Sequence, residues 1–303
     1  MYIGLDIGGT KTELGVFSEE LERLYTARIA TIKESYTDFL SSIVQLVISA
    51  DKACGLGKAI GVGMPGLRDK AGLTLSANIP AANARNVLDD LTAQLNRTAV
   101  MENDCRCFAL SEACYGAGEG YASVYGAVLG TGAAGGFVVG GKLIPAAQGI
   151  AGEYGHQALP AHLREKYNLP IIQCGCGLTG CLENYITGPG LTALHSHLGG
   201  ESLLPPAIMS IANQGDTIAG KTRDCHLDLL GYSIATLILN YDPHVIVMGG
   251  GMSLIGGIIE KLPLAIGCHL FDRFSAPPIK LAKYGDASGA RGAAILARQA
   301  YHA

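Results

Sequence analysis

Short apolar blocks with strand character alternate along the chain with longer blocks whose apolar positions follow helical spacing. Residues 2–8 and 12–17 are predicted to form two strands joined by a GGTK turn, which makes a hairpin. Residues 35–53 have the apolar spacing of an amphipathic helix, and residues 59–64 form a short apolar run typical of a buried strand. This alternation predicts an α/β fold.

The second half of the chain repeats the pattern. Residues 122–130 and 135–140 are predicted to begin a second sheet, and a loop-rich stretch covers residues 141–181. A long helical block at 216–240 leads into the apolar strand 244–248. Both halves therefore contain strands that run into Gly-rich turns, which indicates two similar lobes with a cleft between them.

We place the domain boundary near residue 116, in a GAGEGY turn. Residues 1–116 then form the N-terminal lobe, and residues 117–287 form a C-terminal lobe that carries the Cys-rich loop. The last helix, at about 288–303, is expected to pack back on the N-terminal lobe.

Composition narrows the classes of function. The 303 residues include 42 glycines and carry a formal net charge of −4, with charges of both signs dispersed. This balance argues against a nucleic-acid partner bound by general electrostatics. The N-terminal MYIGLDIGGT does not resemble a signal peptide, and no apolar run is long enough to span a bilayer, so we expect a cytoplasmic protein with no membrane partner.

Three Gly-rich turns are candidates for phosphate binding. Glycines let backbone N–H groups approach an anion closely, and a carboxylate at a strand end can hold Mg²⁺. One such turn alone is equally consistent with an ordinary hairpin, but two on opposite lobes could grip one triphosphate. The candidate ATP and Mg²⁺ residues are Asp6, Gly8, Gly9, Thr10, Lys11, Gly130, Thr131, Gly132, Gly249, Gly250 and Gly251.

A Glu-Asn-Asp motif stands where a predicted strand gives way to a helix. Asp104 at this junction could be a simple helix cap, or it could be the carboxylate that a kinase uses as a general base. Asn103 beside it can donate to and accept from sugar hydroxyls.

His156, Cys174, Cys176 and Cys181 have the residue types and spacing of a closed tetrahedral Zn²⁺ site. The alternatives are three buried thiols with a surface histidine, or His162 in place of His156. The adjoining carboxylates Glu153 and Glu183 would be brought together by the metal, and they suit sugar hydroxyls. The other cysteines are interpreted as buried helix thiols; they are Cys54, Cys105, Cys107, Cys114, Cys225 and Cys268.

Taken together, these motifs resemble the ROK family (repressor, open reading frame, kinase) along essentially the whole chain. The matching stretches are DIGGTK at 6–11, GMPG at 63–66, END at 102–104, LGTG with GG at 129–136, GEYGH at 152–156, CGCGLTGCLE at 174–183 and DPHVIVMGGG at 242–251. Within the family the chain looks most like bacterial N-acetyl-D-glucosamine kinases, with SANIPAA at 76–82, CFALSEA at 107–113 and YGDASGARGAA at 284–294 as the nearest local matches.

The resemblance implies a two-lobed actin-like ATPase fold of the ribonuclease H-like type. It also implies transfer of the γ-phosphoryl group of ATP to a sugar 6-hydroxyl, with Mg²⁺, a structural Zn²⁺ and Asp104 as general base. A homodimer is expected on the same ground. The residues that would contact sugar are Gly66, Asn78, Asn103, Asp104, Glu153, His156 and Glu183. The family also contains repressors with an added N-terminal DNA-binding module, which we do not expect here.

The small residues Ile79-Pro80-Ala81-Ala82 after Asn78 favour N-acetyl-D-glucosamine as the acceptor. Fructokinase, mannokinase and N-acetylmannosamine kinase activities are the alternatives, together with a weakly catalytic sugar-binding regulator.

The chain departs from the family pattern where relatives typically read NDAN and this chain reads Asn103-Asp104-Cys105-Arg106. Arg106 could pair with Asp104 and slow turnover, point into water, or neutralise the transferred phosphoryl group. The first option predicts that Arg106→Asn raises kcat.

Overall fold

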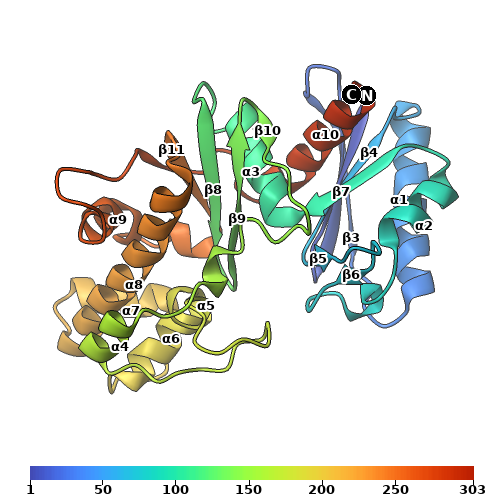
Figure 1. Cartoon of the computed structure of the whole chain (residues 1–303). Coiled ribbons are helices and arrows are strands. Elements are labelled where there is room, and N and C mark those ends of the chain that lie inside the picture. Colours follow the sequence, from blue (N-terminus) through green and yellow to red (C-terminus); the bar gives the residue numbers. More distant parts are fainter. The chain divides into compact units, whose positions relative to one another are not determined.

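The computed structural model describes residues 1–303, with the side chain of Asp286 outside the description. The chain forms two compact units (Figure 1). The first contains Met1–Gly120, Gly136–Gly152 and Tyr284–Ala303, and the second contains Tyr121–Gly135 and Glu153–Lys283.

This division differs from the expected one, which assigned all of residues 117–287 to the second lobe. Within residues 136–152, which belong with the first unit, Arg106 binds both ends of an irregular stretch. Its guanidinium donates hydrogen bonds to the backbone carbonyls of Ile144 and Ala151.

The first unit is built on a five-stranded mixed sheet in the order β3-β2-β1-β4-β7. The first three strands are antiparallel, whereas β1, β4 and β7 are parallel. Their bounds are β1 Tyr2–Ile7, β2 Lys11–Phe17, β3 Arg23–Ala30, β4 Ile60–Met64 and β7 Ala99–Asn103. The strands β5 (Leu67–Arg68) and β6 (Thr74–Leu75) form a separate hairpin.

Helices pack on both faces of this sheet (Figure 1). They are α1 Tyr36–Cys54, α2 Val87–Leu95, α3 Asp104–Cys114 and α10 Ser288–Tyr301. The helix α10 lies directly against β1 and β4, and a side chain at Gly4 or Gly61 would collide with its backbone. A Cβ atom there would stand 1.8 Å from the Ala290 oxygen or 1.7 Å from the Ala293 oxygen.

The second sheet has the order β10-β9-β8-β11-β12. Its strands are β8 Ser123–Leu129, β9 Ala133–Val139, β10 Lys142–Leu143, β11 Val245–Gly249 and β12 Ile279–Leu281. The strands β8, β11 and β12 are parallel and end at the same edge.

Helices make up much of the second unit, to which β8, β11 and β12 also belong. They are α4 Ala161–Tyr167, α5 Glu183–Ile186, α6 Gly188–His197, α7 Pro205–Asn213, α8 Thr217–Tyr241 and α9 Ile258–Gly267. The long helix α8 is in contact with the other five, so it is the centre of this helical layer. Among the described residues, no helix is both long and apolar enough to cross a membrane.

Candidate active site and metal centre

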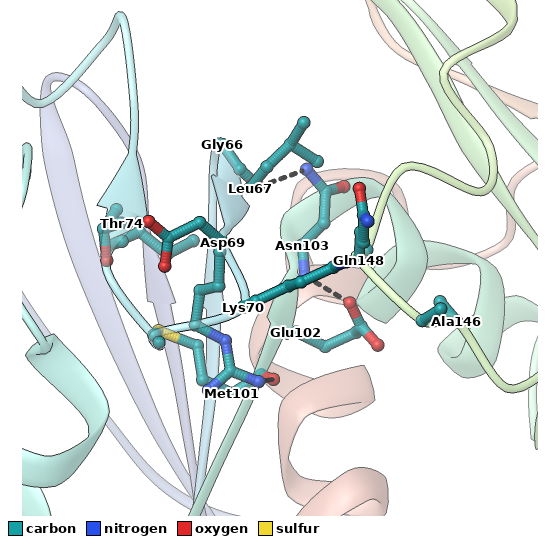
Figure 2. Close-up of a pocket in the computed structure, with 15 residues that line it drawn as sticks. Gly66, Leu67, Asp69, Lys70, Thr74, Met101, Glu102, Asn103, Ala146 and Gln148 are labelled. Atoms are coloured by element: carbon teal, nitrogen blue, oxygen red, sulfur yellow. Dashed lines mark hydrogen bonds between the residues drawn. The ribbon is translucent and has the colours of Figure 1, made fainter.

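A cavity of about 240 Å³ lies at the carboxyl ends of β4 and β7 in the first unit (Figure 2). Ligands of α/β proteins typically bind at this edge of a sheet. Backbone and side chains from residues 64–74, 101–103 and 146–149 form its walls. The polar side chains among them belong to Arg68, Asp69, Lys70, Thr74, Glu102, Asn103 and Gln148.

Gly66 and Asn103, both expected to contact sugar, line this cavity and are bonded to each other (Figure 2). Asn103 Nδ2 donates to the Gly66 carbonyl at 3.3 Å, while Asn103 Oδ1 caps α3 by accepting from the N–H groups of Cys105 and Arg106. Gly66 has φ +112°, and a Cβ atom would lie 2.2 Å from the Leu75 oxygen, so only glycine fits there.

Asp104 is the first residue of α3 and follows the cavity residues Glu102 and Asn103 directly. Its carboxylate is partly buried, and this burial raises the pKa of Asp104 above its ordinary value. The N–H of Cys105 donates to Asp104 Oδ1 at 2.9 Å, which opposes the rise. The net effect is a carboxylate that accepts a proton more readily than an exposed aspartate does.

The first Gly-rich turn joins β1 to β2, next to Asp6 near the end of β1. The N–H of Gly8 donates to the Lys11 carbonyl at 2.9 Å and closes the turn, and Thr31 Oγ1 donates to the Gly8 carbonyl at 2.7 Å. Asn78 lies against this turn rather than in the cavity, since a Cβ atom on Gly9 would stand 3.1 Å from the Asn78 backbone oxygen.

The other two Gly-rich turns meet in the second unit. Residues 130–132 link β8 to β9, and Gly250 follows β11 with φ +81°. A Cβ atom on Gly250 would approach the Leu129 oxygen to 2.4 Å, so glycine is required for this contact. The fold thus brings two of the three predicted turns to one edge of one sheet.

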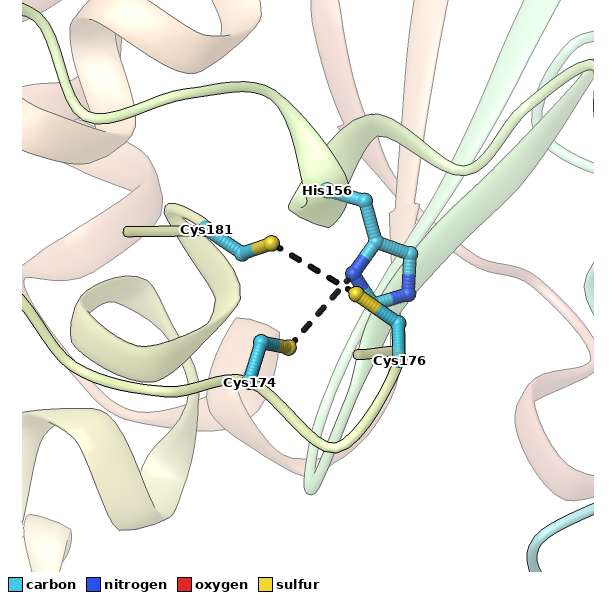
Figure 3. Close-up of side chains that lie close together, drawn as sticks. All are labelled: His156, Cys174, Cys176 and Cys181. Atoms are coloured by element: carbon cyan, nitrogen blue, oxygen red, sulfur yellow. Dashed lines mark hydrogen bonds between the residues drawn. The ribbon is translucent and has the colours of Figure 1, made fainter. Parts of the chain in front are cut away.

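The four predicted metal ligands converge in the second unit, with their ligand atoms all within 4.8 Å of one another (Figure 3). Cys176 Sγ and Cys181 Sγ are 3.6 Å apart, and Cys174 Sγ is 3.8 Å from His156 Nδ1. A tetrahedral Zn²⁺ with bonds of about 2.3 Å to sulfur requires ligand separations of about 3.8 Å. The donor set therefore fits Zn²⁺, and all nine cysteines are free thiols.

The carboxylates on either side of the ligand set are held by this framework. Glu153 Oε2 lies 3.6 Å from His156 Nε2, whereas the other ring nitrogen, Nδ1, is the one near Cys174. Glu183 Oε2 accepts a hydrogen bond from the N–H of Ala133 at 3.1 Å. Carboxylates placed behind a ligating histidine orient its ring, so Glu153 would support the metal.

His162, the rival ligand, lies elsewhere. Its ring packs against Tyr232 and His269, with centroids 5.8 and 6.2 Å away. The prediction that the remaining six cysteines are buried is wrong for four of them, because Cys54, Cys105 and Cys114 are only partly buried and Cys268 is exposed. Cys107 and Cys225 are buried, but Cys268 is exposed because it stands at the open end of α9.

A model described as the ROK family matches residues 2–300. This chain belongs to the ROK family. Its two-lobed α/β fold is the actin-like ATPase fold of ROK structures, which confirms the predicted fold. A ROK hexokinase from Thermus thermophilus superposes with a TM-score of 0.88 at 31% identity, covering 99% of both chains. A ROK family glucokinase from Streptomyces griseus, in complex with glucose and AMPPNP, superposes with a TM-score of 0.77 at 28% identity, covering 98% of this chain and 99% of that one.

Two curated relatives have equal identity to this ROK protein. It is 44% identical over 296 residues to the N-acetylgalactosamine kinase AgaK of Shewanella sp. (strain ANA-3), covering 98% of this chain and 96% of that protein. It is 44% identical over 300 residues to the N-acetyl-D-glucosamine kinase of Haemophilus influenzae (strain 86-028NP), covering 98% and 99%.

Arg106 is the departure from the usual ROK sequence. It neither pairs with Asp104 nor points into water, which were two of the predicted alternatives. Its side chain is only 2% exposed, and its Nε lies 3.1 Å from Glu102 Oε1. The guanidinium is thus paired with Glu102 and bonded to two backbone carbonyls, not to Asp104. The prediction that Arg106→Asn raises kcat depended on a pair between Arg106 and Asp104, and the structure does not contain that pair.

Sequence reasoning missed several polar residues of the cavity in this ROK protein. Arg68 follows the quoted GMPG stretch, and its Nη2 donates to the Met101 carbonyl at 3.4 Å. Glu102 belongs to the quoted END motif, which was a signal available in the sequence. Gln148 lies in a segment without helix or strand, and no sequence pattern marked it.

Proposed function

We propose that this chain transfers the γ-phosphoryl group of ATP to the 6-hydroxyl of N-acetyl-D-glucosamine, with Asp104 as the general base. The single observation that carries the proposal is the position of Asp104. It is a partly buried carboxylate at the start of α3, directly after the cavity residues Glu102 and Asn103, in a ROK chain whose relatives are N-acetylhexosamine kinases. A kinase needs such a carboxylate to orient the acceptor hydroxyl and take its proton.

Burial supports this role for Asp104 in energetic terms. A raised pKa makes the carboxylate a better proton acceptor, and the group stays ionised wherever the pH exceeds that value. Asn103 is fixed by its bonds to Gly66 and to the α3 backbone, so it would present a rigid amide edge to the sugar. Polar side chains that are already fixed lose little conformational entropy when they bind and orient an acceptor hydroxyl.

The Gly-rich turns would hold the nucleotide. Asp6, Thr10 and Lys11 would serve the phosphates in the first unit, and residues 130–132 and 249–251 would serve the nucleotide in the second. When bound, Mg²⁺ would neutralise negative charge on the phosphates. Asp6 is the residue that would hold it, usually through water.

The zinc ligands would act on the sugar indirectly. His156 would use Nδ1 for the metal and leave Nε2, with Glu153, for the substrate. Glu183 would complete this group of polar residues from the start of α5. These assignments predict that metal loss weakens sugar binding more than nucleotide binding.

N-acetyl-D-galactosamine is the second candidate acceptor, because the relative from Shewanella with that activity is as similar as the N-acetyl-D-glucosamine kinase from Haemophilus. The two sugars differ only in the orientation of the 4-hydroxyl. The short, small Pro80–Ala82 turn after Asn78 remains our reason for expecting an acylated sugar. The expected homodimer and cytoplasmic location stay predictions.

A coupled assay of ADP release, run on a panel of sugars, tests the proposal. We expect the highest kcat/KM with N-acetyl-D-glucosamine, followed by its 4-epimer, and low values with fructose, mannose, glucose and N-acetylmannosamine. The 6-deoxy analogue of N-acetyl-D-glucosamine is the matched control, since it lacks the accepting hydroxyl and should release no ADP. A preference for fructose would refute the assignment of substrate.

A further inference from the structure

Arg106 is the largest fully buried side chain among the described residues, and its guanidinium makes two hydrogen bonds and one ion pair. Nη1 donates to the Ala151 carbonyl at 3.1 Å, and Nη2 donates to the Ile144 carbonyl at 2.9 Å. Nε faces Glu102 Oε1 at 3.1 Å. The contact to Glu102 is an ion pair without hydrogen-bond geometry at Nε, so the two directional bonds are those to the carbonyls. A planar guanidinium can hold two carbonyls in fixed directions at once, which an ammonium does less well.

The two carbonyls that Arg106 binds stand at the two ends of one segment, residues 144–151. Residues 145–150 form neither helix nor strand. Ala146, Ala147, Gln148 and Gly149, in the middle of this segment, line the cavity. Arg106 thus fastens both ends of a segment whose middle is a wall of the proposed sugar site.

The other partner of Arg106 is also a wall of the cavity. Glu102 lines it, is 21% exposed, and accepts the N–H of Asn103 at 3.0 Å through the same oxygen that faces Arg106. The buried charge of Arg106 is therefore compensated by Glu102, which a buried cation requires. Gly136 leaves room for the arginine stem, since a Cβ atom there would stand 3.0 Å from Arg106 Cα.

We propose that Arg106 is a positioning residue that sets the width of the substrate cavity by holding residues 144–151 against the end of β7. The proposal rests on the proposed function for its kinetic consequence. Arg106 touches neither the substrate cavity nor Asp104 in the described contacts, so its effect reaches the sugar through Glu102 and through the wall at 146–149. It governs how tightly the acceptor sugar is held, not the transfer of the phosphoryl group.

The test compares Arg106→Lys with a matched control, Arg97→Lys. Arg97 is also a largely buried arginine of the first unit, paired with Asp51 at 2.6 Å and bonded to the Gly57 carbonyl at 3.2 Å, but it does not line the cavity. Lysine keeps the charge in both variants and loses the multiple contacts of the guanidinium. A general loss of packing should therefore affect both variants alike.

We expect Arg106→Lys to raise the KM for N-acetyl-D-glucosamine about tenfold, with kcat within about threefold of wild type and the KM for ATP unchanged. Arg97→Lys should leave both KM values unchanged. Equal effects in the two variants, no change in Arg106→Lys, or a fall in kcat at constant sugar KM would each overturn the proposal. Arg106→Gln serves as the second variant if the lysine variant does not fold.

Hydrogen exchange of backbone amides provides a readout that needs no turnover. In Arg106→Lys without substrate, exchange should accelerate in residues 146–150 and stay unchanged in α1 and β1. Unchanged exchange at 146–150 would refute the proposal that Arg106 holds this segment. In the wild type, N-acetyl-D-glucosamine should slow exchange in the same residues. If no sugar is phosphorylated, the proposed function fails while the substrate-free comparison still decides whether Arg106 holds the segment.

Discussion

Glu183 accepts a hydrogen bond from the backbone N–H of Ala133, with 3.1 Å between Glu183 Oε2 and the Ala133 nitrogen. Glu183 stands two residues after the predicted metal ligand Cys181, and Ala133 directly follows the Gly130-Thr131-Gly132 turn. The metal centre and one proposed phosphate turn are therefore joined by a single side chain within the second unit. Loss of the metal should therefore alter the position of this turn.

Metal analysis of protein purified without added zinc should give close to one equivalent of Zn²⁺ per chain. Cys176→Ser removes one of the four ligands and should lower zinc content and raise the KM for the sugar, because Glu153 and Glu183 lose their framework.

Cys268→Ser is the matched control for the zinc experiment, since Cys268 is also an exposed thiol but lies outside the ligand set. His162→Asn tests the rival ligand in the same way. Full zinc content in Cys176→Ser, or zinc loss in His162→Asn, would show that the ligands are assigned wrongly.

Asp104→Asn should fold and bind ATP normally but lose most turnover. Loss of a general base typically lowers the rate by ~10²–10⁴-fold. The measurement is kcat with saturating sugar and ATP, alongside nucleotide binding by calorimetry. Near-normal kcat would remove Asp104 from the mechanism.

The same variant should be at least as stable as the wild type at neutral pH. Burial raises the folded-state pKa of Asp104 above the unfolded value of about 3.9, so the folded state binds more protons between these two values. Stability of the wild type therefore falls as pH rises through that window, whereas the asparagine of the variant does not ionise. The gap in Tm between the two proteins should close below about pH 4; a gap that widens on acidification would contradict the buried-carboxylate assignment.

The pH dependence of kcat/KM should also reflect the raised pKa of Asp104. Because Asp104 must be ionised to act as a base, activity should rise with pH through its elevated pKa. The acidic limb is thus expected above the value of about 3.9 that an unperturbed aspartate shows. A limb at or below that value would indicate that the base is an exposed carboxylate instead.

Gly66→Ala should destabilise the protein and damage sugar binding, because Gly66 has φ +112° and a new Cβ would lie 2.2 Å from the Leu75 oxygen. A residue forced into an incompatible backbone conformation destabilises by more than ~1 kcal/mol. Gly220→Ala, inside α8 where a Cβ meets nothing within 4 Å, is the control and should stabilise by up to ~1 kcal/mol. Thermal unfolding of both variants checks the pair, and equal shifts would be evidence against a strained turn at Gly66.

Local sequence patterns were sufficient to predict those features of the molecule that depend on short segments. The β1–β2 hairpin follows from two apolar runs around GGTK, and the metal ligands follow from three cysteines close in sequence with one upstream histidine. Asn103 and Gly66 were predicted to contact sugar through resemblance; the structure places both in one cavity, and the contact itself stays a prediction. These features depend on few residues with strict geometric demands.

Long-range packing of irregular segments could not be predicted in this way. Residues two positions apart along a helix differ by about 200° in direction, since 3.6 residues make a turn, so Arg106 faces away from Asp104 once α3 begins at Asp104. Residues 144–151 have no periodic pattern, and hence nothing in the sequence indicated that their carbonyls bind Arg106. The position of residues 136–152 in the first unit was missed for the same reason.

The most direct test of the account is the ratio of kcat/KM for N-acetyl-D-glucosamine to that for glucose, measured by coupled ADP release in wild type and in Asp104→Asn. We predict a ratio well above one in the wild type, and loss of ADP release with both sugars in the variant. ADP release that is independent of any sugar, or that survives in Asp104→Asn, would contradict the central claim that this chain is an N-acetylhexosamine kinase with Asp104 as its base.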